Sequence, residues 1–273
     1  MSEPQISLLI TNVGQLISMQ GPVPRVGEQL SDIGLIEGGA IAVAGGQIVS
    51  AGPAEVVERK VSLADDCQVI DVDGRVVTPG LIDPHTHPIF SRTRENEFEM
   101  RVQGKAYMEI AEAGGGIRAS VRDLRTTPRD IIKQRSFERL TRMLTYGTTT
   151  AEAKSGYGLS TEAELLSLEL VKELNEEHVV DLVPTFLGAH EIPDEYRGRT
   201  DQYIELINEE MLPQVVEGDL AEFSDVFCEV GVFDIEQSRR IQSAAKAAGL
   251  GLKFHADEIK PLGGAELAAE LGA

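Results

Sequence analysis

Histidines at the ends of apolar segments carry the main chemistry that this sequence could perform. His85 and His87 are separated by one residue and follow the apolar segment that ends at Ile82. In an extended chain, residues i and i+2 point to the same side, so both imidazoles can bind one metal ion. His255 follows another apolar segment and offers a third nitrogen. We therefore expect His85, His87 and His255 to be metal ligands.

A nitrogen-rich site with an open coordination position suits Zn²⁺ or Fe, and the residue types do not discriminate between these metals. Such an ion activates water for attack at neutral pH, so metal-assisted hydrolysis is the indicated reaction class. Glu258 lies three residues beyond His255. From there its carboxylate can move protons between the water and a leaving nitrogen. We expect Glu258 to be catalytic.

Four polar clusters each follow an apolar segment, and these segments alternate with amphipathic ones from residue 76 onward. This alternation predicts a parallel sheet with helices between its strands. In a parallel α/β barrel the C-terminal ends of the strands share one face, so the clusters should converge there. The clusters are 83–87, 152–157, 188–191 and 255–258. The expected strands are 76–82, 148–153, 179–187, 226–232 and 250–254, and the expected helices are 128–144, 161–175, 200–216 and 235–248.

The chain before residue 76 has a different pattern, with short β segments separated by glycine turns. The pairs Gly45-Gly46 and Asp73-Gly74 between apolar runs are typical of hairpins. The expected strands here are 8–13, 40–44, 47–50 and 68–72. We therefore expect a small β domain over residues 1–75 and an α/β barrel domain over residues 76–273.

The composition argues against several classes of partner. The chain has 45 acidic and 25 basic residues, and its net charge of −20 disfavours binding to nucleic acid or to an anionic membrane. The sequence shows no signal peptide and no apolar run of about 18 residues. Cys67 and Cys228 are far apart and form no CxxC motif, which favours a reducing compartment. We expect a cytoplasmic protein without nucleic-acid or membrane partners.

The segment 78–87 resembles the first-strand signature of the amidohydrolase superfamily, and five later segments resemble the imidazolonepropionase family within it. These segments are 92–99, 113–117, 151–158, 187–191 and 254–258. The resemblance covers essentially the whole chain. It implies a TIM-like (β/α)8 barrel with a small N-terminal β-sandwich domain and one Zn²⁺ or Fe ion per subunit. It also implies hydrolysis of the cyclic amide C–N bond of 4-imidazolone-5-propanoate to N-formimidoyl-L-glutamate, a step of histidine degradation.

The same resemblance implies roles for individual residues. Arg94, Tyr157, His190 and Glu258 would bind the substrate, and His190 and Glu258 would also be catalytic. The planar fork of Arg94 suits the propionate carboxylate. Tyr157 and His190 can hydrogen-bond a heterocycle and its developing oxyanion. The implied partner is thus a small anionic heterocycle, while the oligomeric state stays open, with a homodimer among the options.

The sequence departs from the family after its fifth expected barrel strand. A barrel of this type has eight strands, and about five βα units fit before Ala273. We therefore expect a C-terminally shortened copy, which lacks the family's metal-binding aspartate on the last strand and part of the β domain. Three alternatives stay open: another cyclic amidase of the superfamily, a nucleobase deaminase, or a non-catalytic fragment. We expect this chain alone to bind metal weakly and to lack turnover.

Overall fold

The computed structural model describes residues 5–105, 109 and 115–273, and the chain divides into two compact units after Gly80. The strand expected over residues 76–82 is in fact two strands. β5 (Val76–Val77) belongs to the first unit and β6 (Leu81–Thr86) begins the second. Pro79 lies between them and has no N–H to donate to a β ladder. Of the segments that resemble the family, Ala113 and Gly114 lie outside the described residues.

Over residues 5–80 the first unit forms one five-stranded sheet, and the second facing sheet expected of a sandwich is not seen among these residues. The strand order is β3-β2-β1-β4, and β5 also pairs with β1. Its core consists of small and branched apolar side chains from the sheet and from helix α1, such as Ile6, Ala40 and Val57. The elements are β1 (Gln5–Ile17), η1 (Gly27–Ser31), β2 (Leu35–Ala44), β3 (Gln47–Pro53), α1 (Ala54–Glu58) and β4 (Ser62–Asp71).

The two glycine turns of this unit behave differently. Gly45 and Gly46 have φ of 58° and 77°, and the strands beside them pair antiparallel, so the hairpin expected there is confirmed. Asp73 and Gly74 also have positive φ. However, β4 and β5 both pair parallel with β1, so the hairpin expected at this turn is wrong. The long strand β1 pairs with β4 and then with β5, both in the parallel direction. The turn at Asp73 and Gly74 connects these two strands without reversing the chain.

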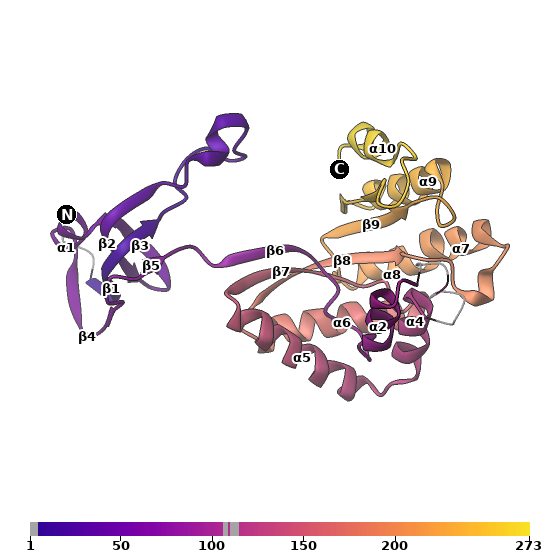
Figure 1. The fold of residues 1–273 in the computed structure, drawn as a ribbon, viewed down its shortest axis with the longest axis horizontal. Helices are drawn as coiled ribbons and strands as arrows, with labels where there is room; N and C mark the ends of the chain where they lie inside the picture. Colours follow the sequence, from indigo (N-terminus) through magenta and orange to yellow (C-terminus); the bar gives the residue numbers. More distant parts are fainter. Residues whose placement is uncertain (1–4, 106–108, 110–114) are drawn as a thin grey trace. The chain divides into compact units, whose positions relative to one another are not determined.

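The second unit is the expected parallel sheet with helices between its strands (Figure 1). The strand order is β10-β9-β8-β7-β6, and β11 also pairs with β9. The strands are β6, β7 (Thr148–Lys154), β8 (Asp181–Ala189), β9 (Phe223–Cys228), β10 (Gly251–Leu252) and β11 (His255–Ala256). The expected helices correspond to α5 (Arg129–Thr145), α6 (Thr161–Glu177), α7 (Thr200–Leu206) with its π-helical continuation η3 (Ile207–Met211) and α8 (Leu212–Glu217), and α9 (Ile235–Ala247). Unexpected elements are α2 (Glu95–Val102), α4 (Ile117–Thr126) and η2 (Asp194–Tyr196), while α10 (Gly264–Leu271) comes after β11.

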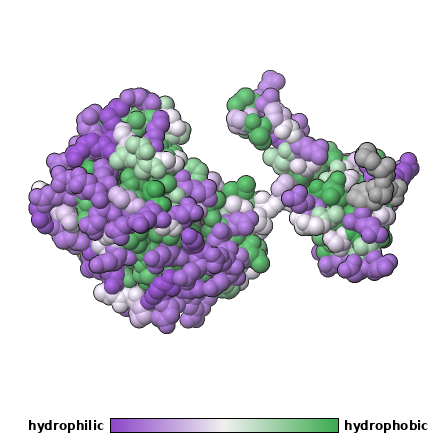
Figure 2. All heavy atoms as spheres, turned by 180° about the vertical axis from the view of Figure 1, so that it is seen from behind, coloured by the Kyte–Doolittle hydropathy of each residue, from purple (hydrophilic) through white to green (hydrophobic). Residues whose placement is uncertain are grey.

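Burial explains why the helices lie on this sheet. α6 buries Leu168, Val171 and Leu174 against the strands, as its helical spacing of apolar residues requires. In contrast, Leu81 and Ile82 on the edge strand β6 are 55% and 70% exposed. Figure 2 shows hydrophobic residues gathered in the middle of the larger unit, with hydrophilic residues around them. Among the described helices, none combines the length and apolar character needed to cross a bilayer.

Candidate metal centre and substrate site

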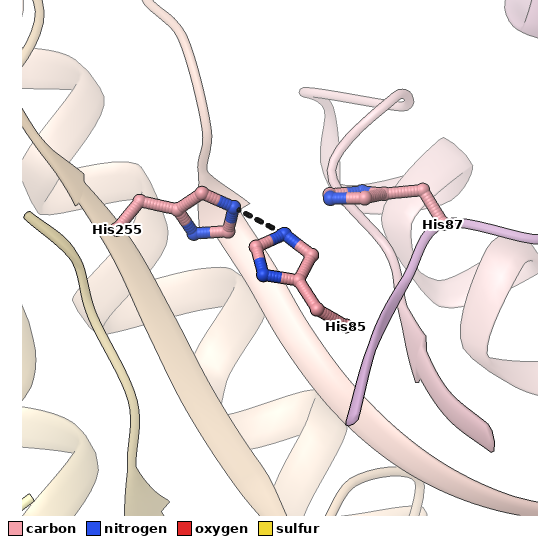
Figure 3. A group of neighbouring side chains, drawn as sticks. All are labelled: His85, His87 and His255. Atoms are coloured by element: carbon pink, nitrogen blue, oxygen red, sulfur yellow. Dashed lines mark hydrogen bonds between the residues drawn. The ribbon is translucent and has the colours of Figure 1, made fainter. Parts of the chain in front are cut away.

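The three expected metal ligands meet at the C-terminal ends of the strands. His85 lies on β6, His87 comes directly after it, and His255 begins β11. One ring nitrogen from each histidine lies within 4.8 Å of the other two, as Figure 3 illustrates. The Nε2 atoms of His85 and His255 are 2.9 Å apart. The parallel topology thus brings together residues from opposite ends of the sheet, as expected; their role as ligands stays a prediction.

The donor set fits a cation. Burial lowers the pKa of His87 well below its usual value, and burial together with the nearby His255 lowers the pKa of His85. Neutral imidazole is the form that binds metals. His87 Nδ1 is buried and has no hydrogen-bond partner among the described residues. The facing Nε2 atoms of His85 and His255 can share one proton, or a cation can replace it.

His190 and Tyr157 lie beside the three histidines. The His190 ring stacks on His87 with centroids 5.0 Å apart, and the Tyr157 ring centroid lies 5.3 Å from that of His190. His190 Nδ1 is 2.9 Å from the carbonyl oxygen of Gly156. A carbonyl only accepts, so Nδ1 carries the proton and Nε2 is unprotonated. Burial lowers the pKa of His190 to about 4.

This tautomer changes the role expected for His190. Because Nδ1 already donates to the Gly156 carbonyl oxygen, the neutral ring has only a lone pair left, at Nε2. A lone pair suits a ring N–H of a heterocycle, or a proton in transfer, better than it suits a developing oxyanion. The sequence alone does not define this tautomer.

Arg94 and Glu258 are placed less closely than the histidines. Arg94 precedes α2, and its Nε is 3.8 Å from the carboxylate of Glu97. After burial and His255, the charge of Arg94 makes a smaller contribution to the lowered pKa of His190. The Glu258 side chain is exposed, and no hydrogen bond or ion pair joins it to another described residue. The structure therefore does not bring Glu258 into contact with the histidines.

The loop that carries Glu258 is anchored by two neighbouring carboxylates. Glu229 accepts a 2.8 Å hydrogen bond from the backbone N–H of Ile259. Asp257 accepts from the N–H groups that precede and begin α10, including Leu262 at 2.6 Å, and these bonds lower its pKa to about 2. Asp257, which belongs to the polar cluster 255–258, thus has a structural role.

Glu164 is a buried carboxylate that the sequence reasoning did not identify. Its Oε1 accepts 2.8 Å hydrogen bonds from the N–H groups of Gly158 and Leu159, and its Oε2 accepts one of 3.0 Å from Gly156. Burial raises its pKa, although these hydrogen bonds oppose the increase. Glu164 therefore holds the loop that carries Tyr157. In the sequence, Gly156 and Gly158 before α6 are the feature that indicates a turn with backbone N–H groups available to such a carboxylate.

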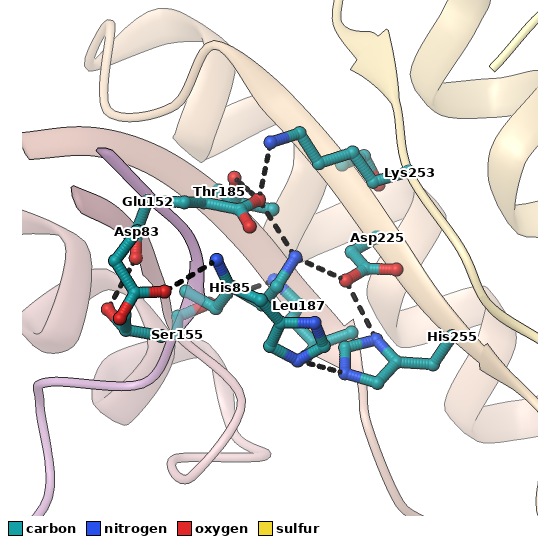
Figure 4. Close-up of polar contacts among 12 residues, drawn as sticks. Asp83, His85, Glu152, Ser155, Thr185, Leu187, Asp225, Lys253 and His255 are labelled. Atoms are coloured by element: carbon teal, nitrogen blue, oxygen red, sulfur yellow. Dashed lines mark hydrogen bonds and ion pairs between the residues drawn. The ribbon is translucent and has the colours of Figure 1, made fainter. Parts of the chain in front are cut away.

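Beneath the histidines lies a layer of buried charges. Lys154 Nζ is 2.8 Å from Glu152 and 2.7 Å from Asp225, and Lys253 Nζ is 2.7 Å from Glu152. Figure 4 shows Asp225 reaching toward His255, whose Nδ1 is 2.9 Å away. Burial alone would raise the pKa of Asp225, but His255 and Lys154 lower it below its usual range. Sequence reasoning placed Glu152 and Lys154 in a polar cluster and missed Asp225.

Known proteins give two kinds of match. No protein-family model matches the chain. The chain is 49% identical over 269 residues to imidazolonepropionase from Geobacillus kaustophilus, a match that covers 97% of this chain and 63% of that protein. It is 48% identical to imidazolonepropionase from Alkaliphilus metalliredigens, covering 98% of this chain and 64% of that protein. The chain thus spans just under two thirds of the length of these curated relatives.

Solved structures match at the level of fold. Escherichia coli guanine deaminase aligns with a TM-score of 0.63 at 15% identity, covering 97% of this chain and 59% of that one. A mutant atrazine chlorohydrolase from Arthrobacter aurescens, complexed with zinc, aligns with a TM-score of 0.58 at 15% identity, covering 97% and 58%. Identities this low support the fold alone. The expected α/β fold, a parallel sheet with helices between its strands, is confirmed.

Proposed function

We propose that this chain, which is similar in sequence to imidazolonepropionases, acts in the metal-dependent hydrolysis of 4-imidazolone-5-propanoate. The reaction breaks the cyclic amide C–N bond and yields N-formimidoyl-L-glutamate in histidine degradation. The observation that carries the proposal is the meeting of three histidine nitrogens within 4.8 Å at the ends of parallel strands. Relatives with this name match nearly the whole chain.

His85, His87 and His255 would hold one Zn²⁺ or Fe ion. A bound ion of this kind supplies Lewis acidity and activates water. Two observations support the assignment: the lowered pKa values of His85 and His87, and the buried Nδ1 of His87 that lacks a partner among the described residues. A solved structure with the same fold is complexed with zinc.

The remaining residues would bind and orient an anionic heterocycle. The guanidinium of Arg94 pairs with the propionate carboxylate through two parallel hydrogen bonds. Tyr157 and the unprotonated Nε2 of His190 contact the ring. Glu258 transfers a proton to the leaving nitrogen. Support for this arrangement comes from the stacking of His190 on His87 and from the loop anchors that hold Tyr157 and Glu258.

The metal assignment is tested by metal analysis of the purified chain. We expect His85→Ala to lose most of its bound zinc or iron, because one of three ligands is removed. His178→Ala is the matched control, since His178 lies beside Phe137, outside the group of three ligand histidines. Unchanged metal stoichiometry in His85→Ala would refute the ligand assignment.

The substrate is tested by assaying the purified protein, with whatever its gene encodes beyond Ala273, against imidazolonepropionate, guanine and cytosine. Guanine deaminase shares this fold, so nucleobases are the strongest rival substrates. Arg94 discriminates between them, because a neutral nucleobase has no carboxylate to pair with it. We expect N-formimidoyl-L-glutamate as the product. Deamination of guanine or cytosine without hydrolysis of imidazolonepropionate would overturn the proposal.

We also propose a cytoplasmic protein that binds this small anionic heterocycle and neither nucleic acid nor membranes. Cys67 and Cys228 are both free thiols, which fits a reducing compartment. The net charge of −20 would repel nucleic acid and anionic lipid. Sedimentation equilibrium would establish whether the protein is a homodimer.

A further inference from the structure

Asp225 lies where it can control which nitrogen of His255 faces the metal site. Its Oδ2 is 2.9 Å from His255 Nδ1. The Asp225 side chain is 1% exposed and that of His255 is 10% exposed, so water does not compete strongly for this contact. This contact has the distance of an ion pair without hydrogen-bond geometry, and His255 Nδ1 has no other hydrogen-bond partner among the described residues. A carboxylate can only accept, so its position beside Nδ1 favours the proton on that nitrogen.

The opposite nitrogen of the same ring faces the other histidines. His255 Nε2 lies 2.9 Å from His85 Nε2, as Figure 3 shows. With the proton on Nδ1, the lone pair of His255 is on Nε2, on the side where the three ligand atoms gather. The contact with Asp225 thus selects the tautomer that a metal ligand needs.

The position of Asp225 is itself fixed on every side. Its Oδ1 accepts a 2.8 Å hydrogen bond from the backbone N–H of Val226, and its Oδ2 also contacts Lys154 Nζ at 2.7 Å. Lys154 is held in turn by Glu152 at 2.8 Å. The side chains of Lys154 and Glu152 are each 3% exposed, so Asp225 has little freedom to turn away from His255.

We propose that Asp225 is a positioning residue that fixes the tautomer and orientation of His255, and that Lys154 holds Asp225 in this role. The inference rests on the proposed function only in taking His255 as a metal ligand. Hydrogen bonds from a ligand histidine to a carboxylate raise the basicity of the ligand and orient its ring, and losing one typically weakens metal binding about 10- to 100-fold. Asp225 makes no contact with the metal or substrate in this proposal.

The first measurement reads the tautomer directly in the purified, metal-free 273-residue chain. Two-bond ¹H–¹⁵N correlation spectra of ¹⁵N-histidine-labelled protein distinguish protonated from unprotonated ring nitrogens, with His255→Gln used to assign the signals. We expect His255 to carry its proton on Nδ1. A proton on Nε2 in the wild-type chain would overturn the proposal, and this result does not depend on any variant folding.

The second measurement is the dissociation constant for Zn²⁺, obtained by competition with a chromogenic chelator. We expect Asp225→Asn to weaken binding about 10- to 100-fold and to shift the His255 proton toward Nε2, since an amide can donate to Nδ1. Ser224→Ala, a buried neighbour on the same strand, should leave both readouts unchanged. A folded Asp225→Asn chain with wild-type affinity and tautomer would contradict the inference.

The two proposals fail in different ways. If the wild-type chain shows the Nδ1–H tautomer but binds no Zn²⁺ or Fe, the metal-dependent function is wrong and the positioning of His255 by Asp225 stands. If the wild-type chain binds Zn²⁺ and loses nothing in Asp225→Asn, the function stands and the positioning role is wrong.

Discussion

Two clusters of ion pairs in the second unit have similar distances and very different surroundings. In the sheet, Lys154 lies 2.7 to 2.8 Å from two carboxylates whose side chains are 1 to 3% exposed. Between α5 and α6, Arg129 and Lys133 lie 2.5 to 2.9 Å from Glu173, whose side chain is 37% exposed. The distances alone therefore do not show which cluster matters more for stability. Burial distinguishes them, because water screens the charges around Glu173 and does not reach those around Lys154.

The largest effect is expected for the buried cluster. Lys154→Met removes the ammonium that the carboxylates of Glu152 and Asp225 share, and breaking a buried pair in this way costs about 3–5 kcal/mol. The free energy of unfolding, measured by urea denaturation with circular dichroism, should fall by that amount. Lys172→Met, on the exposed face of α6, is the control and should change it little. If the free energy of unfolding falls by less than about 1 kcal/mol in Lys154→Met, the buried cluster contributes no more than a surface ion pair and the prediction is wrong.

An intermediate effect is expected for Glu164, which is buried but bonded to neutral groups, namely backbone N–H groups of the preceding loop and the side chain of Ser155. In Glu164→Gln one side-chain oxygen becomes an NH₂ group, which faces the backbone N–H of Gly156 or of Gly158 and Leu159. Leaving such buried donors unsatisfied costs about 1–3 kcal/mol.

Thermal unfolding of the Glu164→Gln chain should report this loss. Glu162→Gln, an exposed position in the same turn of α6, is the control and should unfold at the wild-type temperature. If the two variants unfold at the same temperature, Glu164 does not hold the loop that carries Tyr157.

The smallest effect is expected for the exposed cluster. Glu173→Gln should lower the free energy of unfolding by less than about 1 kcal/mol, because the pair is solvated. Hydrogen bonds from Arg129 and then Lys133 lower the pKa of Glu173 to about 2. Since the unfolded value is about 4.3, this stabilisation is complete above about pH 5 and is lost as the pH falls toward 2.

The pH dependence gives a direct check. The difference in stability between the wild type and Glu173→Gln should shrink between pH 5 and pH 3. Glu176→Gln, at an exposed position of the same helix, should show no such difference. A constant gap between wild type and Glu173→Gln at both pH values would contradict the assigned partners.

The sequence predicted the histidine cluster because strand alternation and topology determine which residues share a face. His85, His87 and His255 come after apolar segments, and parallel strands bring such positions together. The expected ends of strands were less accurate. β9 begins at Phe223 and not at residue 226 as expected. The prediction started too late because Ser224 and Asp225 are polar and do not resemble the interior of a buried strand.

Long-range pairing is the part that sequence reasoning could not supply. Asp225 is tolerated inside β9 because His255 and Lys154, the latter 71 residues earlier, lie against its carboxylate. Glu164 falls in the first turn of the helix expected over residues 161–175, where acidic residues are common because of the helix dipole. Its buried hydrogen bonds depend on how the preceding loop folds back onto α6. Neither arrangement has a period or a motif that could reveal it.

The edge position of β6 has a consequence for motion. Among the described residues β6 pairs only with β7, with register breaks near both Leu81 and Thr86, whereas β8 pairs with strands on both sides. Amide protons of β6 should therefore exchange with deuterated solvent sooner than those of β8. His85 belongs to this readily opened strand and His87 comes directly after it. Binding of an ion to the histidine cluster and opening of the β6 edge are therefore linked, and a bound ion should slow the exchange of the β6 amides.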